Sequence, residues 1–318
     1  MPRRKTIDYR LILKVSKLYY EQGLTQQEIS QRLVLSRPKV SRLLKQAEDV
    51  GVVKINIIPQ PGYYTDLEQA LEEKYGLLEA VVVGVSEPSS QLAVSREVGA
   101  AAADYFVRSM VEPSVVGIAW GTTLRAMVDA IQVMDCPKSH VVQINGGLGK
   151  PESEAHATYI LRRLVSQINS KLSILSAPGI VDNTKVKEVF ISDSHVQEVL
   201  RLYKEIDVAY VGVGAPTQDS VVMMDGSIIS ESDLNKLIKL GAVGDICLRY
   251  FDQDGKPLVS DVDERVMGIT LDELKRIERV VGVTGGPNKD LAIRAALQGK
   301  LINVLITDHQ SAKKILEV

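Results

Sequence analysis

The chain has 318 residues, of which 45% are hydrophobic and 25% charged, and its net charge is −2. This composition is typical of a soluble globular protein, and the length exceeds one ordinary hydrophobic core, so we expect two domains. No apolar run approaches the roughly 18 residues of a membrane span, and the N-terminal residues lack the apolar core of a signal peptide. We therefore expect a cytoplasmic protein with no membrane partner.

Charge is distributed unevenly along the chain. Residues 1–60 carry 12 Lys and Arg against 5 Asp and Glu, a net charge of +7, whereas the remainder carries 26 against 35, a net charge of −9. A basic head on an acidic body indicates that only the head meets a polyanion. The two cysteines, Cys136 and Cys247, and the four scattered histidines have no disulfide-framework or metal-site spacing. We expect a reducing compartment, no metal and no cofactor.

The first part of the head has the spacing of two helices. Gly23 ends the first helix. Thr25 and Glu28 form a T-x-x-E capping box, which predicts the start of a second helix with Ile29 and Leu33 turned inward. The apolar residues that we expect on one face of the first helix are Leu11, Ile12, Val15, Leu18 and Tyr19.

A third helix and a strand follow. Ser36 is placed to cap the helix, and Pro38 lies in its first turn, where a missing N–H is tolerated. Gly51 ends the helix, and residues 53–57 alternate like a strand. This order predicts a winged helix-turn-helix. The apolar residues expected to face the core are Val40, Leu43, Leu44 and Ala47.

The opposite face of the third helix is basic and polar. A recognition helix of this size fits the major groove, and its N-terminal residues reach base edges. The alternative is a solvated basic face, but the run lies in a capped three-helix unit within the +7 segment, which favours operator DNA as the partner. The candidate DNA-binding residues are Arg37, Lys39, Ser41, Arg42 and Lys45.

The stretch YYEQGLTQQEISQRLVLSRPKVSRLLKQAEDVGVVKI resembles the head of the SorC/DeoR-type bacterial transcriptional regulators, and the resemblance covers nearly all the chain. It implies a winged helix-turn-helix at 1–58 and an effector-binding and oligomerisation domain at 59–318. It also implies a regulator of a carbohydrate-related operon, controlled by a phosphorylated sugar and assembled as a homo-oligomer, dimer or tetramer.

The body alternates strands and helices. Residues 58–64 have the composition of a linker, and residues 65–77 form an amphipathic helix that is suited to pairing subunits. β-Branched runs separated by helices predict a Rossmann-like open α/β fold with a mostly parallel sheet. The buried-looking runs are 80–85, 115–121, 140–146, 171–177, 207–215, 245–251, 280–286 and 302–308.

Small and polar residues follow several of these runs. Ligands bind open α/β sheets beyond the carboxyl ends of the strands. The segments GTT (121–123) and TGGPNK (284–289) each precede a helix, and free backbone N–H groups at a helix start suit a phosphate. The alternative is a set of ordinary glycine turns. The candidate effector-binding residues are Gly121, Thr122, Thr123, Asn145, Gly146, Asp245, Gly285, Gly286 and Lys289.

The family resemblance implies roles for some of these residues. It relates the body to the glucosamine-6-phosphate deaminase and ribose-5-phosphate isomerase fold. VGIAWGTTL resembles the phosphate loop, GAVGDICLRYFDQDG maps Asp245 onto the contact with sugar hydroxyls, and VVGVTGGPNKDLAIRAAL maps Lys289 onto the ligand. Asn145 stands where some relatives carry arginine. Without that arginine, the resemblance does not imply a site for a second phosphate or a bisphosphate effector.

Two other functions remain as alternatives. A sugar-phosphate isomerase or deaminase fused to a DNA-binding head would need an acid and a base near the sugar carbons, and Asp245, Lys289 and His156 are the available candidates. No established catalytic motif of the related enzymes is visible, so we assign no catalytic residue and expect no enzyme. The third possibility is a body that only oligomerises, with empty glycine turns.

Overall fold

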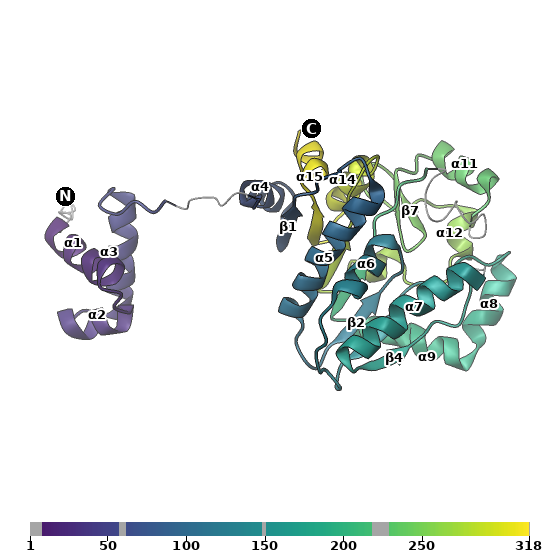
Figure 1. Cartoon of the computed structure of the whole chain (residues 1–318), viewed down its shortest axis with the longest axis horizontal. Coiled ribbons are helices and arrows are strands. Elements are labelled where there is room, and N and C mark those ends of the chain that lie inside the picture. The colour runs from purple at the N-terminus through teal and green to yellow at the C-terminus, as the bar shows by residue number, and fades with distance from the viewer. Residues whose placement is uncertain (1–7, 57–61, 148–150, 218–228, 318) are drawn as a thin grey trace, which may run out of the picture. The chain divides into compact units, whose positions relative to one another are not determined.

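The computed structural model describes residues 8–56, 62–147, 151–217 and 229–317, with the backbone alone for residues 151–156. The chain divides into two compact units, Met1–Gln60 and Pro61–Val318. The first unit is helical, and the second contains the sheet (Figure 1). Each unit is described by itself below.

The first unit is built from α1 (Tyr9–Ser16), the π-helical turn η1 (Lys17–Glu21), α2 (Gln26–Leu33) and α3 (Arg37–Asp49). The predicted capping box is confirmed, because the Glu28 amide donates to Thr25 Oγ1 (3.3 Å) and the Thr25 amide donates to Glu28 Oε2 (2.7 Å). Tyr19 was expected on the buried face but is exposed, since the wider π-helical turn changes the angular spacing of the side chains. The buried core contains Ile12, Val15, Leu18, Ile29, Val40, Leu43, Leu44 and Ala47.

One expectation for this unit holds only in part, and another is wrong. Ser36 is the N-cap residue of α3, but its side chain makes no capping hydrogen bond. The strand predicted over 53–57 is not formed by residues 53–56, which pair with no strand in the described part of the chain, and Ile57 lies outside it. Alternating apolar residues predict that one face of a segment is buried. A strand also needs a partner strand to bond its backbone N–H and C=O groups. Val53 instead packs beside the helical core.

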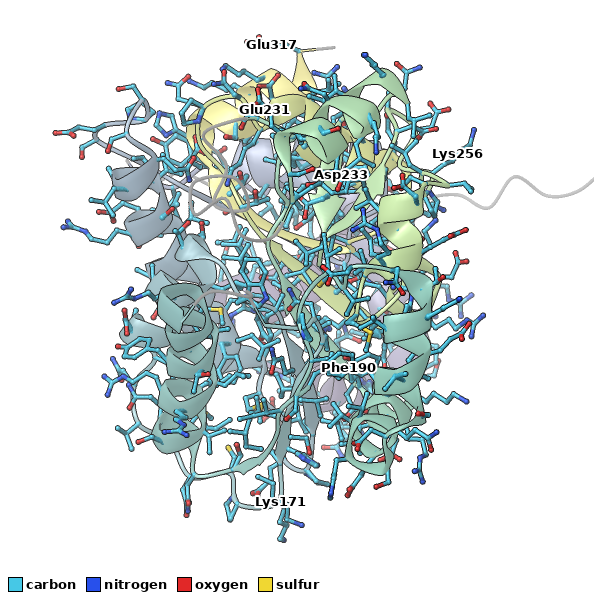
Figure 2. The ribbon with its side chains drawn as sticks, turned by 90° about the vertical axis from the view of Figure 1, so that its right-hand side faces the viewer. Lys171, Phe190, Glu231, Asp233, Lys256 and Glu317 are labelled. Atoms are coloured by element: carbon cyan, nitrogen blue, oxygen red, sulfur yellow. The ribbon has the colours of Figure 1, made fainter. Side chains whose placement is uncertain are left out.

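The second unit contains a seven-stranded sheet in the order β1-β9-β8-β5-β2-β3-β4, and every pairing is parallel. The predicted parallel α/β architecture is confirmed. Helices cover both faces of the sheet (Figures 1 and 2), which explains why the strands are continuous apolar runs. The strands are β1 (Glu79–Val83), β2 (Val115–Ile118), β3 (His140–Gln143), β4 (Lys171–Ser173), β5 (Val208–Val211), β8 (Arg279–Val283) and β9 (Val304–Asp308).

Some helices of this unit follow the sequence prediction, and others do not. The amphipathic helix expected over 65–77 is α4, whereas several short helices after β4 had no prediction. The helices are α4 (Thr65–Tyr75), α5 (Gln91–Ser109), α6 (Thr122–Ala130), α7 (Pro151–Ile168), α8 (Thr184–Ser192), α9 (Ser194–Leu202), η2 (Tyr203–Glu205), α11 (Glu231–Lys239), α12 (Asp261–Arg265), α13 (Leu271–Leu274), α14 (Asp290–Gln298) and α15 (His309–Leu316). Among the residues that the structure describes, none of these helices is long and apolar enough to cross a membrane.

The run 245–251 is not a strand of the main sheet. It forms an antiparallel hairpin of β6 (Gly244–Ile246) and β7 (Arg249–Phe251). The two turn residues, Cys247 and Leu248, have φ angles of 54° and 68°. A two-residue turn with positive φ at both positions suits a hairpin but normally carries Asn or Gly. Because Cys247 and Leu248 are apolar, the turn lies within a continuous apolar run, and the sequence therefore predicted one strand.

Candidate functional site

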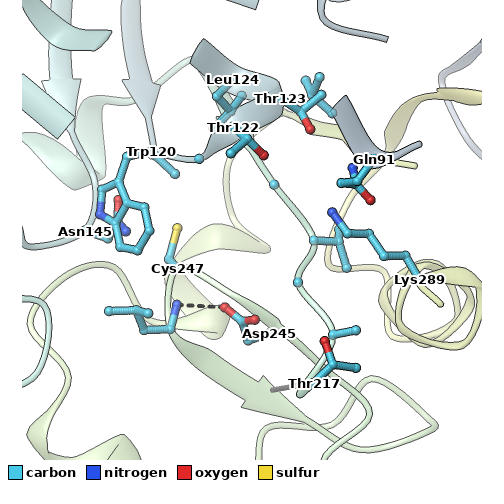
Figure 3. Close-up of a pocket in the computed structure, with 18 of the residues that line it drawn as sticks. Gln91, Trp120, Thr122, Thr123, Leu124, Asn145, Thr217, Asp245, Cys247 and Lys289 are labelled. Carbon is cyan, nitrogen blue, oxygen red and sulfur yellow. Dashed lines mark hydrogen bonds between the residues drawn. The ribbon is translucent and has the colours of Figure 1, made fainter. Parts of the chain in front are cut away.

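A cavity of 330 Å³ lies beyond the carboxyl ends of β2, β3, β5 and β8, as expected for an open parallel sheet. The segments after these four strands form much of its wall, and the β6–β7 hairpin and the start of α5 complete it (Figure 3). The lining residues used below are Gln91, Trp120, Gly121, Thr122, Thr123, Leu124, Asn145, Gly214, Asp245, Cys247, Leu248, Asn288 and Lys289.

One wall of the cavity is the start of α6. Gly121 is its N-cap residue, and no side chain caps the helix there. The first amides of a helix have no partner within the helix, so an uncapped start facing a cavity suits an anion. Thr122 is exposed, whereas Thr123 is buried with its Oγ1 3.2 Å from Ser95 Oγ. Thr122 therefore offers its hydroxyl to the cavity, while the Thr123 hydroxyl is bonded to α5.

A second wall comes from the loop before α14. Lys289 is the N-cap residue of α14 and lines the cavity, and Asn288 beside it has a φ of 64°. Gly285 and Gly286 are not among the lining residues that the structure describes. The Gly286 amide donates to Asp308 Oδ2 (2.8 Å), away from the cavity wall. These two glycines thus support the loop on its side away from the cavity.

Asp245 places a carboxylate in the wall. Its side chain is buried, and Oδ2 accepts a hydrogen bond from the Leu248 amide (3.2 Å). Burial raises the pKa of Asp245 to about 6, although the Leu248 amide and the charge of Lys289 both act to lower it. At neutral pH the group is a charged acceptor in a site where few donors meet it, so hydroxyl groups of a ligand would stabilise it.

Asn145 contributes a second acceptor. Its residue is 2% exposed, and Oδ1 has no hydrogen-bond partner among the described residues. A buried polar atom without a partner is unusual, and a donor from a water or from a bound molecule would satisfy it. Gly146, the next residue, does not line the cavity. A side chain there would collide with the Pro178 carbonyl, so the glycine is needed for backbone packing.

Sequence reasoning missed several lining residues. The Trp120 ring is held in place because its Nε1 donates to the Gly146 carbonyl (2.9 Å). Trp120 directly precedes Gly121 and is the one tryptophan in the sequence, a signal that was available. Gln91 enters from α5, where it donates to the Gly285 carbonyl (3.3 Å), and no local pattern marked it. Burial raises the pKa of the Cys247 thiol, so this residue is not a reactive thiolate.

The candidate DNA-binding residues lie together on α3. Arg37, Lys39, Ser41, Arg42 and Lys45 are all exposed. They alternate with the buried stripe of the same helix, so the basic face points away from the helical core. The Arg42 Nε donates to the Pro38 carbonyl (3.3 Å), which leaves the two terminal nitrogens of the guanidinium for another partner.

The side chain of His156, considered as a catalytic group, lies outside the described residues. Within the described part of the chain, no group of three or more His, Cys, Asp or Glu is arranged to hold a metal ion.

Comparison with known proteins matches both units. Residues 61–317 match the Sugar-bind family of sugar-binding domains, and residues 13–49 match Sigma-70, region 4. The deoxyribonucleoside regulator of Bacillus subtilis is 31% identical over 307 residues, which cover 96% of this chain and 97% of that protein. The sorbitol operon regulator of Klebsiella pneumoniae is 30% identical over 320 residues, 98% of each chain.

Solved structures agree with these matches. The full-length sorbitol operon regulator of Klebsiella pneumoniae has a TM-score of 0.74 at 28% identity, covering 98% of this chain and all of that one. A DeoR family transcriptional regulator from Listeria monocytogenes has a TM-score of 0.72 at 31% identity, covering 79% of this chain and 98% of that one. These relatives are regulators and not enzymes, so the enzyme alternative is set aside. The chain belongs to the SorC/DeoR-type family of sugar-binding transcriptional regulators.

Proposed function

We propose that a phosphorylated monosaccharide binds in the cavity and alters how the helix-turn-helix head engages operator DNA. The observation that carries this proposal is that one cavity contains both groups that favour an anion and acceptors for hydroxyl groups. The uncapped start of α6 and the Lys289 side chain favour an anion, while Asp245 and Asn145 present acceptors for hydroxyl groups. A sugar phosphate has both complements.

The physical terms support a phosphate at the α6 side. An anion at a helix start is stabilised by the aligned peptide dipoles and by free backbone N–H groups, and a lysine ammonium adds a full charge. The 330 Å³ cavity lies at the small end of ligand pockets, which suits one monosaccharide better than a dinucleotide. In this proposal the Gly121 backbone, the Thr122 hydroxyl, the Thr123 amide and the Lys289 ammonium hold the phosphate.

The hydroxyl side uses different residues. Asp245 accepts two neighbouring hydroxyls, and Asn145 Oδ1 gains the partner that it lacks among the described residues. Trp120, fixed by its bond to Gly146, offers an apolar surface to the sugar ring. Gly146, Gly285 and Gly286 support the site through their backbone.

The head acts on DNA in the cytoplasm. Arg37, Lys39, Ser41, Arg42 and Lys45 enter the major groove, and two or more heads of a homo-oligomer read a palindromic operator. The assembly is a dimer or a tetramer. The body, from residue 59, carries effector binding and oligomerisation.

Calorimetry on matched sugars tests the effector. Ribose 5-phosphate, glucose 6-phosphate and sorbitol 6-phosphate would each be titrated beside the unphosphorylated sugar, into wild type, Lys289→Ala and Asp245→Asn. Loss of the phosphate should weaken binding far more than inversion of one hydroxyl, because hydrogen bonds to charged groups are worth about 1.5–3 kcal/mol each. Lys289→Ala should lower affinity by a similar amount, and Asp245→Asn should change which sugar is preferred. Equal affinity for phosphorylated and free sugars would reject the phosphosugar assignment.

A further inference from the structure

The loop that carries Lys289 is hydrogen-bonded to a buried carboxylate outside the cavity. Asp308 is 1% exposed and ends β9, and it is also the N-cap residue of α15. Its Oδ2 accepts from the Gly286 amide (2.8 Å) and from Ser311 Oγ (2.6 Å). A side chain on Gly285 would overlap the same oxygen, so the loop backbone lies directly against the carboxylate.

The second oxygen of Asp308 serves the helix. Oδ1 accepts from the Gln310 amide (3.0 Å) and the Ser311 amide (2.9 Å), which caps α15. Four donors therefore meet one carboxylate, close to the full number that its lone pairs accept. The position of the cavity loop and the position of the first turn of α15 are consequently linked through one rigid group.

Helix α15 in turn holds α4 at both ends. At its start, the His309 ring stacks on Tyr64, the N-cap residue of α4, with ring centroids 5.1 Å apart. At its end, the Ile315 carbonyl accepts from Lys74 Nζ (3.3 Å) and Tyr75 Oη (3.1 Å). A small movement of α15 is therefore imposed on α4 through contacts at both of its ends.

Helix α4 also covers an edge of the sheet. Glu68 Oε1 accepts from the Val82 amide and Glu72 Oε1 accepts from the Ala80 amide, each at 2.9 Å. These amides point outward from β1, an edge strand of the sheet. Helix α4 is the first helix of the chain after the head unit, so it is the element of the body nearest to the head in the sequence.

We propose that Asp308 is a positioning residue that transmits occupancy of the cavity from the 285–289 loop through α15 to α4. This inference rests on the proposed function, because it requires an effector that contacts Lys289 or Asn288. An effector that draws the loop toward α6 moves the Gly286 amide, and Asp308 passes that displacement to the first turn of α15. Coupling of this kind is reciprocal and is usually worth about 5- to 150-fold in affinity.

Asp308→Asn tests the link selectively. Asparagine keeps one acceptor oxygen and can cap α15 as well as aspartate does, but its side-chain nitrogen is a donor and cannot accept from the Gly286 amide as Oδ2 does. Asp193→Asn is the matched control: Asp193 caps α9 through the His195 and Val196 amides, and it does not line the cavity. Should Asp308→Asn fail to fold, Ser311→Ala removes one contact of the Gly286 amide by a milder change.

The experiment measures two affinities and their coupling in the full chain. An operator would be selected from a random-sequence DNA library, and operator affinity would be determined with and without ribose 5-phosphate, glucose 6-phosphate, sorbitol 6-phosphate or inorganic phosphate. Binding of each probe would be followed separately by Trp120 fluorescence. In wild type and Asp193→Asn, a bound probe should change operator affinity. In Asp308→Asn the probe and the operator should each still bind, while the change in operator affinity falls to near onefold.

The other results have distinct meanings. A merely structural role would lower stability and both affinities but leave the coupling ratio unchanged, which would overturn the role of Asp308. Equal coupling in Asp308→Asn and wild type would also overturn it, with the proposed function intact. If wild type binds none of the probes, the proposed function fails, and the effector-driven role of Asp308 fails with it.

Discussion

Gly214 and Asp245 are joined by two backbone hydrogen bonds, from each amide to the other carbonyl, of 2.9 and 3.1 Å. The Asp245 carboxylate lies over the Gly214 Cα, so that a Cβ on Gly214 would overlap Asp245 Oδ1. A segment after β5 and the β6–β7 hairpin are thus held together at the place where the carboxylate enters the cavity. Glycine is required there for steric reasons alone.

Gly214→Ala should therefore displace the Asp245 carboxylate without removing it. We expect effector affinity to fall by an amount similar to that in Asp245→Ala, about 1–3 kcal/mol for a lost charged hydrogen-bonding group. Calorimetry with the tightest-binding sugar phosphate measures the loss. The unfolding transition of ligand-free Gly214→Ala, compared with that of wild type, is the folding control. Unchanged affinity in Gly214→Ala would show that the carboxylate position is unimportant.

Asp245→Asn should stabilise the ligand-free body at neutral pH. The folded-state pKa of about 6 lies above the ordinary 3.8, so ionisation of this group opposes folding. The free-energy cost of ionising Asp245 in the folded body is absent below about pH 4 and grows between pH 4 and 6. It reaches about 1–3 kcal/mol at pH 7. Urea unfolding followed by Trp120 fluorescence at pH 7.5 and 4.5 measures it. A stability gain of the same size at both pH values would contradict this origin.

Val34→Gly should stabilise the head. Val34 is the C-cap residue of α2 with φ 52° and ψ 49°, and it is 91% exposed. A β-branched residue is strained in this left-handed conformation, and relief of the strain exceeds the entropy that glycine adds to the unfolded chain, by roughly 0.5–1 kcal/mol. Thermal unfolding by far-ultraviolet circular dichroism measures the head transition. Val34→Ala keeps the Cβ and should gain less, and the Trp120 signal of the body should not change.

Arg42→Ala should weaken operator binding while leaving the body intact. If the guanidinium reads a base edge, the loss is about 1–3 kcal/mol and specificity relaxes at one operator position. A gel-shift titration at fixed salt measures it, since phosphate contacts make affinity depend on ionic strength. Arg96→Ala removes the same charge from an exposed site on the body and serves as the control. Equal operator affinity for wild type and Arg42→Ala would exclude Arg42 from the interface.

Much of the local structure follows from neighbours in the sequence. The Thr25–Glu28 capping box, the buried stripe of α3 and the parallel strands are each encoded within a few residues, by cap chemistry or by the spacing of apolar side chains. The start of α6 at Gly121 was visible for the same reason. Where the local signal was misleading, as at Cys247 and Leu248, a turn was built from residues that rarely adopt positive φ.

The sequence by itself determined the class of fold, the position of the DNA-binding helix and the glycine-rich segments that follow the strands. Only the tertiary structure decided which of these segments face one cavity. Gln91, Trp120, Asn145, Asp245 and Lys289 meet because of the order of strands in the sheet and the β6–β7 hairpin, which depend on contacts between residues far apart in the chain. The tertiary structure likewise turned Gly286 away from the cavity and onto Asp308, because a backbone amide bonds to whichever acceptor the packed chain brings near it.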